Sequence, residues 1–286
     1  MRLLITGCSG QLGQEWVHYL DSMKIPFTAY NSKTLDITDP EALESTLDND
    51  APDVVINCAA YTKVDQAEEE KELALLINHN AVEHLATACR DRDIKLVHFS
   101  TDYVFSGESI DREKFPNGYP EQAETRPVNF YGVSKLKGEE SIQKTEVDYL
   151  ILRVSWLCGA YGNNFVKTML RLAKERESLS VVNDQFGVPT FCTQVVNQTL
   201  KLIEQNQRGV FHLGSAGIIS WYQFALRIFE LSGVEVNVKE VSSNEFKTKA
   251  KRPHFSKLNT SKADQILQSD SLHWEAGLKQ ILKAIN

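Results

Sequence analysis

The feature that most restricts the fold is a short apolar run near the N-terminus that leads into three evenly spaced glycines. Residues 2–6 (RLLIT) are followed by Gly7, Gly10 and Gly13. After a strand, such glycines permit a tight turn and let a phosphate approach the backbone, and the N-terminus of the next helix attracts the anion. The spacing is G-x-x-G-x-x-G and not the common G-x-G-x-x-G, so a glycine-rich turn without a ligand stays an alternative.

Short β-branched runs alternate with amphipathic stretches through the first half of the chain. The expected strands cover residues 2–6, 27–30, 53–57, 95–100 and 149–155, and the expected helices cover residues 10–23, 40–48, 73–90 and 129–144. The second helix has a well-marked start, because Asp39 can cap it, Pro40 fits its first position and Glu41 places an acid in its first turn. This alternation predicts an α/β fold of the Rossmann type, with a doubly wound parallel sheet.

The second half is less regular and predicts a smaller C-terminal lobe. Helices are expected at residues 164–176, 193–205, 221–231 and after Trp274, and strands at residues 179–182, 209–213 and 237–241. We expect the sheet domain to comprise residues 1–155 and about 189–215, and the lobe to comprise about 156–188 and 216–286. Residues 106–128 show no helix or strand periodicity, so they predict a long loop that is functional or mobile.

Composition and charge exclude several classes of protein. Apolar residues make up 42% and charged residues 24% of the chain, as in ordinary globular domains. A net charge of −7 argues against a nucleic-acid partner. The apolar runs are shorter than the roughly 18 residues of a membrane span, and the first reaches glycine too soon for a secretory signal. The five cysteines form no C-x-x-C pair and no metal-ligand spacing, so we expect reduced thiols, no disulfides and a cytoplasmic location.

The end of the second expected strand bears on the choice of dinucleotide. An acid there would hold the ribose 2′-hydroxyl of NAD, but the sequence offers Asn31, Ser32 and Lys33. A lysine and hydroxyls can accept a 2′-phosphate, which favours NADP(H) and leaves NAD(H) open. Lys33 is equally typical of a solvated loop lysine. Asp36 and Ile37 are expected to lie at the edge of the adenine.

Tyr131 and Lys135 give the strongest chemical signal, at the start of an expected helix. Residues four apart share one helix face, so an ammonium can stabilise the phenolate and lower the tyrosine pKa toward neutrality. Thr101 follows the fourth expected strand, at the edge of the sheet where α/β proteins bind ligands. The spacing alone is also typical of an exposed helix face. The context therefore carries the prediction that Thr101, Tyr131 and Lys135 are catalytic.

A run of small residues follows the third expected strand, over residues 57–62 (NCAAYT). Such residues let a cofactor pass close to the backbone, and a tight turn between strand and helix is the alternative. Together these motifs resemble the extended short-chain dehydrogenase/reductase superfamily and, within it, the branch of dTDP-4-dehydrorhamnose reductases. The resemblance spans nearly the whole chain, at residues 6–13, 57–65, 100–105, 131–139, 153–156, 162–166, 183–190 and 252–258.

The resemblance implies reduction by NADPH or NADH of the C4 ketone of dTDP-4-dehydro-β-L-rhamnose, which gives dTDP-L-rhamnose for cell-surface polysaccharide. It implies that Tyr131 donates the proton, that Lys135 lowers its pKa and binds the nicotinamide ribose, and that Thr101 binds the sugar. The expected substrate-binding residues are Thr101, Asp102, Tyr131, Trp156, Asn163, Asn164 and Arg252. The expected cofactor-binding residues are Gly7, Ser9, Gly10, Gln11, Leu12, Gly13, Asn31, Ser32, Lys33, Asp36, Ile37, Cys58, Ala59, Ala60, Tyr61, Thr62, Asn78, Ser100, Tyr131 and Lys135.

Other functions stay open beside this one. The chain could reduce another nucleotide 4-keto sugar, or act as a nucleotide-sugar epimerase or 4,6-dehydratase. Dehydratases carry Thr-Asp-Glu after the fourth strand, and Tyr103 stands at the glutamate position here, which disfavours dehydration. A related protein is a noncatalytic, NADP-binding regulatory subunit of methionine adenosyltransferase. The intact set of Thr101, Tyr131 and Lys135 favours an enzyme over that role.

Some members of the resembled family use magnesium at a dimer contact, and Glu15 lies where one ligand would come from. No partner carboxylates are found by motif, so the sequence supports no metal site. Glu15 is instead expected to be a solvated charge in the first helical turn. The sequence leaves open whether the chain forms a homodimer.

Overall fold

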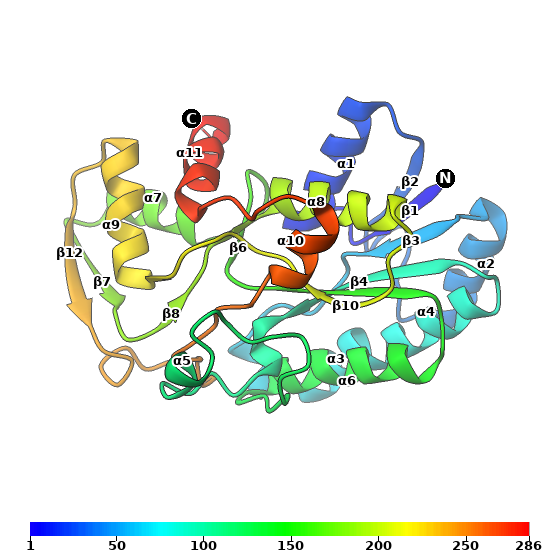
Figure 1. Ribbon diagram of the computed structural model, residues 1–286, viewed down its shortest axis with the longest axis horizontal. Helices are drawn as coiled ribbons and strands as arrows, with labels where there is room; N and C mark the ends of the chain where they lie inside the picture. The colour runs from blue at the N-terminus through cyan, green and yellow to red at the C-terminus, as the bar shows by residue number, and fades with distance from the viewer. Residues whose placement is uncertain (286) are drawn as a thin grey trace.

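A six-stranded parallel sheet organises the computed structural model, which describes residues 1–285 (Figure 1). Its strand order is β10-β5-β4-β3-β1-β2, and every neighbouring pair is parallel. The strands are β1 (Leu3–Thr6), β2 (Phe27–Tyr30), β3 (Val54–Asn57), β4 (Lys95–Thr101), β5 (Tyr149–Val154) and β10 (Gly209–His212). The predicted Rossmann-type α/β fold is confirmed.

Helices cover both faces of this sheet, because successive strand residues point to opposite sides. Leu3 and Ile5 pack on α1 (Gln11–Met23) and α8 (Cys192–Glu204), whereas Leu4 packs on the opposite layer. That second layer contains α2 (Pro40–Asp50), α4 (Ala81–Arg90) and α6 (Phe130–Lys144). Figure 1 shows the two helix layers above and below the sheet. Within residues 1–285, no helix combines the length and the apolar character that a membrane crossing requires.

The helix expected at residues 73–90 is interrupted, so its prediction as one α-helix is wrong. The chain forms α3 (Lys71–Leu75), a π-helical turn η2 (Leu76–Asn80) and then α4. The wider turn places the buried Asn78 where its side chain accepts from the Tyr61 nitrogen at 2.9 Å and donates to the Tyr61 oxygen at 3.0 Å and to Ser134 Oγ at 3.0 Å. These bonds fix the segment after β3 and join it to α6. The side-chain hydrogen bonds of Asn78 override the regular helical period.

The rest of the chain forms a second apolar cluster at one end of the molecule (Figure 1). There β7 (Ser178–Val182) pairs with β12 (Asn237–Val241) in parallel. They pack with α7 (Phe165–Glu175), α9 (Trp221–Ser232) and α11 (Trp274–Ile285). Five elements of this half were not expected: helix α10 (Ser261–Leu267) and the two-residue strands β6 (Leu157–Cys158), β8 (Phe186–Gly187), β9 (Thr190–Phe191) and β11 (Ile219–Ser220). The proposed domain boundaries stay a prediction.

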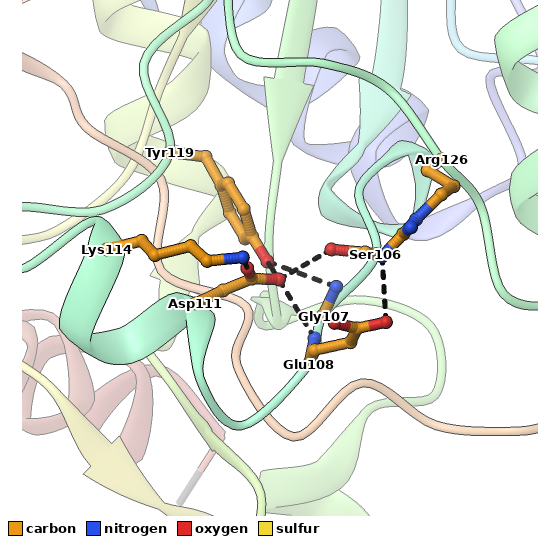
Figure 2. A network of polar contacts seen from close by, with 7 residues as sticks. All are labelled: Ser106, Gly107, Glu108, Asp111, Lys114, Tyr119 and Arg126. Carbon is orange, nitrogen blue, oxygen red and sulfur yellow. Dashed lines mark hydrogen bonds and ion pairs between the residues drawn. The ribbon is translucent and has the colours of Figure 1, made fainter.

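Residues 106–128 differ from the expected loop without regular structure, because they contain the single helical turn α5 (Asp111–Lys114). Figure 2 shows the polar network that holds it. The buried Asp111 carboxylate accepts from Ser106 Oγ at 2.5 Å, from the Glu108 nitrogen at 3.0 Å and from Tyr119 Oη at 2.6 Å. The Gly107 nitrogen in turn donates to Tyr119 Oη at 3.1 Å. Four local hydrogen bonds therefore stabilise a segment in which no periodicity is visible.

Tyr119→Phe is expected to lower the free energy of unfolding by about 1–3 kcal/mol, because it removes one of the three donors to the buried Asp111 oxygen and leaves the Gly107 N–H without its partner. Urea unfolding of the two proteins measures the difference. The matched control is Lys114→Met, which removes only an ion pair to Asp111 from a side chain that is 58% exposed. That control should change stability by less than about 1 kcal/mol. Equal effects of the two substitutions would contradict this account of the loop.

Candidate active site

The sheet has its topological switch point between β1 and β3, because β2 lies beyond β1 and β4 lies beyond β3. Ligands of open α/β sheets bind at the carboxyl ends of the strands at such a point. A cavity of 640 Å³, here called the central cavity, lies there. It is lined by Ser9, Gly10, Gln11, Leu12, Asn57, Cys58, Ala59, Ala60, Thr62, Val64, Phe99, Ser100, Thr101, Asp102, Tyr103, Tyr131, Lys135, Val154, Trp156, Leu157, Gly162 and Asn163.

The glycine turn forms one wall of the central cavity and has no room for side chains at two of its positions. Gly7 has φ +67°, and a Cβ there would lie 2.6 Å from the backbone nitrogen of Ala59. A Cβ on Gly13 would lie 2.3 Å from the Gly7 oxygen. Gly10 caps α1 without any side-chain hydrogen bond, so first-turn N–H groups remain for an anion. The turn therefore fits the diphosphate of a dinucleotide.

A second cavity of 240 Å³ borders the same turn. It shares Ser9, Gly10, Cys58, Ala59 and Ala60 with the central cavity, so the two hollows border the same backbone. Its remaining lining residues are Gly7, Ser32, Leu35, Asp36, Ile37, Thr38 and Ile77. An elongated ligand with two ends and a charged middle would fit this arrangement.

Two of the residues expected at the cofactor lie outside both linings. Lys33 is exposed, and Asn31 Oδ1 accepts from the Lys33 nitrogen at 2.9 Å, which shapes the turn after β2. Ser32, Asp36 and Ile37 lie at the second cavity as expected. The cofactor roles of these residues stay predictions.

Thr101, Tyr131 and Lys135 meet at the central cavity, as the sequence predicts. Thr101 ends β4, and its hydroxyl donates to Asp102 Oδ1 at 3.1 Å. Tyr131 and Lys135 lie in the first turns of α6. Asn129 caps that helix, because its side chain accepts from the Gly132 nitrogen at 2.9 Å. A strand end and a helix start thus place the three groups around one space.

Burial dominates the charges within this group. Lys135 Nζ donates to the Phe99 oxygen at 2.7 Å and lies 3.0 Å from His98 Nε2, and burial lowers its pKa to about 8. The Tyr131 pKa is raised, by burial first and then by the Asp102 carboxylate. In this arrangement the lysine is bonded to β4, and its role in lowering the Tyr131 pKa stays a prediction.

Asp102 is the acidic group of the central cavity. It is 4% exposed, and burial raises its pKa to about 7, although hydrogen bonds from Ser256 and Thr101 oppose that rise. A carboxyl that titrates near neutrality can accept or donate a hydrogen bond. Asp102 is thus suited to bind a sugar hydroxyl in either protonation state.

Trp156 closes the cavity toward the second cluster in a strained conformation. Its φ is +48°, and its ring stacks on Trp221 with a centroid separation of 3.4 Å and an interplanar angle of 10°. Gly187 lies under the ring, since a Cβ there would lie 2.6 Å from Trp156 Cε2. Backbone strain of this kind costs about 1–3 kcal/mol and persists where the surroundings enforce it. The packing therefore fixes the position of this indole.

A third cavity of 460 Å³ shares Val64 and Tyr103 with the central cavity and is lined by Arg252. Arg252 Nη2 pairs with Asp65 Oδ2 at 2.6 Å. Within residues 1–285, Arg252 Nη1 is buried without a hydrogen-bond partner. Such an unsatisfied donor favours an anionic ligand beside it.

Four more predicted site residues lie outside these linings. Gly13 packs on the Gly7 backbone, and Tyr61 and Asn78 bond to each other below the cavity. Asn164 caps α7 through the Lys167 nitrogen and donates to Gln11 Oε1 at 2.8 Å. These contacts shape the site from outside the linings. The proposed direct roles of the four residues stay predictions.

Several lining residues of the central cavity were not expected there. These are Val64, Phe99, Tyr103, Val154, Leu157 and Gly162, whereas Asn57 begins the run of residues 57–62 that was expected beside a cofactor. The apolar ones carry no chemical signal in a sequence. Behind the lining, His98 is fully buried on β4 and touches Lys135. A histidine inside the buried run 95–101 (KLVHFST) is the signal that could have revealed it.

The family described as RmlD substrate binding domain matches residues 1–286. The chain belongs to this family. A dTDP-4-keto-6-deoxy-D-glucose reductase of Streptomyces niveus is 37% identical to it, with 100% of this chain and 98% of the relative covered. A dTDP-4-dehydrorhamnose reductase of Escherichia coli K12 is also 37% identical, over the same shares of both chains.

A solved structure shows the same family and fold. The crystal structure of a dTDP-4-dehydrorhamnose reductase from Bacillus anthracis in complex with NADP superposes with a TM-score of 0.93 and 41% identity. The match covers 99% of this chain and 98% of the other. The resemblance to the dTDP-4-dehydrorhamnose reductase branch is thereby confirmed.

The expectation that Glu15 is a solvated charge is wrong. This residue is not a solvated charge in the first turn of α1, because it is 6% exposed and its Oε1 accepts from Thr193 Oγ1 at 2.8 Å. It joins α1 to α8. Among residues 1–285, no group of three or more histidine, cysteine or acidic side chains is placed to hold a metal ion.

Asp102→Asn is expected to flatten the pH dependence of folding stability. Burial raises the folded pKa of Asp102 from 3.8 to about 7. The protonated Asp102 carboxyl therefore contributes to the free energy of unfolding fully below about pH 4, and this contribution is lost as the pH rises through 7. The variant should lose less stability than the wild type between pH 5 and 8, as urea midpoints at each pH would show. The exposed Asp91→Asn variant is the control, and identical slopes for all three proteins would contradict the assignment.

Proposed function

We propose that the chain is an NADPH-dependent reductase that converts the C4 ketone of dTDP-4-dehydro-β-L-rhamnose to the alcohol of dTDP-L-rhamnose. The observation that carries the proposal is the meeting of Thr101, Tyr131 and Lys135 at the cavity of the topological switch point. The family and the names of its members agree with this activity. The product would serve as a precursor of cell-surface polysaccharide.

The cofactor would lie across the glycine turn. The backbone around Gly7 and Gly10 would hold the diphosphate, Ser32 and Ile37 would face the adenosine end, and Ser100 would face the nicotinamide end. When bound there, the dinucleotide supplies the hydride. NADPH is favoured because the Bacillus anthracis relative binds NADP and because the exposed Lys33 follows β2, while NADH remains an alternative.

Tyr131 would donate a proton to the C4 oxygen. Burial raises its pKa, so the phenol keeps its proton at neutral pH until a strongly basic oxyanion forms next to it. Thr101, at the end of β4, would hold the same oxygen by a hydrogen bond. A charged Lys135 would then stabilise the phenolate that Tyr131 becomes, and solvent would return the proton.

The substrate would extend from the central cavity into the third cavity. Asp102, Trp156 and Asn163 would contact the sugar, and Arg252, which lines the third cavity, would bind the diphosphate. The sugar and the nucleotide would thus be held at opposite sides of Tyr103 and Val64. In this proposal the lobe of residues 156–188 and 216–286 supplies Trp156, Asn163 and Arg252, and the sheet domain supplies Asp102.

A second candidate is the reduction of a related sugar. The Streptomyces niveus relative carries the name of a dTDP-4-keto-6-deoxy-D-glucose reductase and is as similar as the Escherichia coli relative. The same proton donor would serve either ketone, so the sugar contacts decide between them. A cytoplasmic location and a homodimer stay predictions.

The test follows the loss of NADPH absorbance, with NADH in parallel, when the protein meets dTDP-4-dehydro-β-L-rhamnose made in situ from dTDP-glucose by a dehydratase and an epimerase. Turnover that needs both upstream enzymes supports the proposal. Turnover after the dehydratase alone identifies dTDP-4-keto-6-deoxy-D-glucose as the substrate. If neither NADPH nor NADH is oxidised with either sugar, although the protein still binds NADPH, the proposed reductase activity is overturned and a noncatalytic binding role is favoured.

Tyr131→Phe is expected to lower turnover by about 10²-fold or more, because it removes the general acid. NADPH binding, measured by fluorescence titration, should stay within a few-fold of the wild type. Tyr149→Phe is the matched control, since Tyr149 begins β5 at the opposite end of the sheet and should leave turnover unchanged. Undiminished turnover in the Tyr131 variant would refute its role.

A further inference from the structure

The hydrogen bonds around His98 determine which of its atoms carries a proton. His98 lies between Asn57 and Lys135, with Nδ1 at 3.1 Å from Asn57 Nδ2 and Nε2 at 3.0 Å from Lys135 Nζ. The histidine is fully buried on β4, so protein groups satisfy both of its nitrogens. The identity of each donor therefore follows from the partners on the two sides.

The orientation of the Asn57 amide is fixed by two donors. Thr6 Oγ1 donates to Asn57 Oδ1 at 2.7 Å, and the Ala59 backbone nitrogen donates to the same atom at 3.1 Å. A backbone N–H can only donate, so the atom that it meets must be the amide oxygen. The NH₂ group of Asn57 then points at His98 and donates to Nδ1. Nδ1 is consequently an acceptor without a proton.

A neutral imidazole with an unprotonated Nδ1 carries its proton on Nε2, and this proton points at Lys135 Nζ. An ammonium has three donors and no lone pair, so it cannot accept that hydrogen bond. A neutral amine can accept it and still donate to the Phe99 oxygen at 2.7 Å. The contact at 3.0 Å is thus a hydrogen bond only if Lys135 is uncharged.

We propose that His98 is a positioning residue that holds Lys135 as a neutral amine in the arrangement seen here, through an Nε2–H donor aligned by Asn57. Conversion to the ammonium then requires Lys135 Nζ to leave His98 for an acceptor in the central cavity. This links the charge of Lys135 to its position. The burial of both side chains, which disfavours their charged forms, acts in the same direction.

The other ionisable groups near the pair do not replace this effect. On α6 these are Tyr131 and Glu139, and Glu139 acts to raise the Lys135 pKa. Its carboxylate is paired with Arg153 of β5 at 2.6 Å, which offsets part of its charge. After β4, Asp102 acts on Tyr131. Among these groups, His98 touches the amine itself.

The first measurement is made on the wild-type protein, and His98→Gln serves only to assign the His98 signals. Nitrogen-15 NMR should show the His98 ring with Nε2 protonated and Nδ1 bare, unchanged between pH 6 and 9. His212 is expected to show the opposite tautomer, because its Nδ1 faces the Tyr119 carbonyl oxygen at 2.9 Å. A doubly protonated His98 ring, or a His98 ring protonated on Nδ1, would overturn the proposal. This result is independent of the reductase assignment because no substrate or cofactor is present.

The second measurement compares the titration of Lys135 in wild type and His98→Gln by NMR of the lysine side chains, with Lys135→Met to assign the signal. The glutamine oxygen can accept from an ammonium, so the Lys135 titration should move up by about one pH unit or more. The control is His212→Gln, since His212 is equally buried but bonds to the Tyr119 oxygen. No difference between His98→Gln and wild type would overturn the proposal.

The kinetic consequence rests on the proposed reductase function. If the ammonium form of Lys135 supports Tyr131, then kcat/KM falls at high pH as the lysine loses its proton. In His98→Gln this alkaline limb should move to higher pH by the same interval as the NMR titration, whereas a merely structural role would lower activity at every pH. A shifted titration without any reductase activity would leave the His98 assignment intact and contradict only the proposed function.

Discussion

The close approach of two strand ends is the constraint on which the site depends. Gly7 at the end of β1 leaves no space for a side chain, because the backbone of Ala59 after β3 is already there, and Gly13 packs equally closely on the Gly7 oxygen. This contact brings the start of α1 beside the segment after β3. The central and second cavities then both border this backbone turn. Any side chain at these two glycines would push the strand ends apart and separate the cavities.

Burial is the second physical factor, and it acts on four ionisable groups of the candidate site at once. Tyr131, Lys135, Asp102 and His98 all line or underlie one cavity, and desolvation is the largest cause of each pKa shift. The shifts favour the uncharged form in each case. A site of this kind holds its groups neutral until a ligand brings charge to it. The partial charge that grows on a reacting oxygen would therefore meet donors that have not already formed ion pairs.

The sequence predicted the elements whose packing follows a simple period. All six sheet strands and most large helices were expected within a few residues, because buried β-branched runs and amphipathic stretches fix them locally. The π turn at residues 76–80 could not be expected, since it depends on the Asn78 side chain reaching Tyr61 from a distant part of the chain. The turn α5 likewise depends on the bonds of Asp111 to Tyr119 and Ser106. Side-chain hydrogen bonds of single residues leave no periodic trace.

The same distinction holds for the site. Thr101, Tyr131 and Lys135 were predictable because each lies at a strand end or helix start that the pattern marks. The charge on Lys135 was not, because it depends on His98 and on the orientation of Asn57, and the chain separates these residues by dozens of positions. A spacing motif reports which groups share a helix face. It carries no information on what else each group touches.

The position of Arg252 shows how the second half of the chain completes the site. The segment around this residue returns to the sheet domain, where the Ala250 nitrogen donates to Asp65 Oδ1 at 3.0 Å and the His254 nitrogen donates to the Gly107 oxygen at 2.7 Å. Asp65 follows β3 and also pairs with Arg252. The proposed diphosphate anchor is therefore tied to the segment that follows β3, whose first residues border the glycine turn. In the proposed function this anchor lies apart from the sugar contacts of the central cavity, so a change in those contacts would alter sugar specificity without removing the anchor.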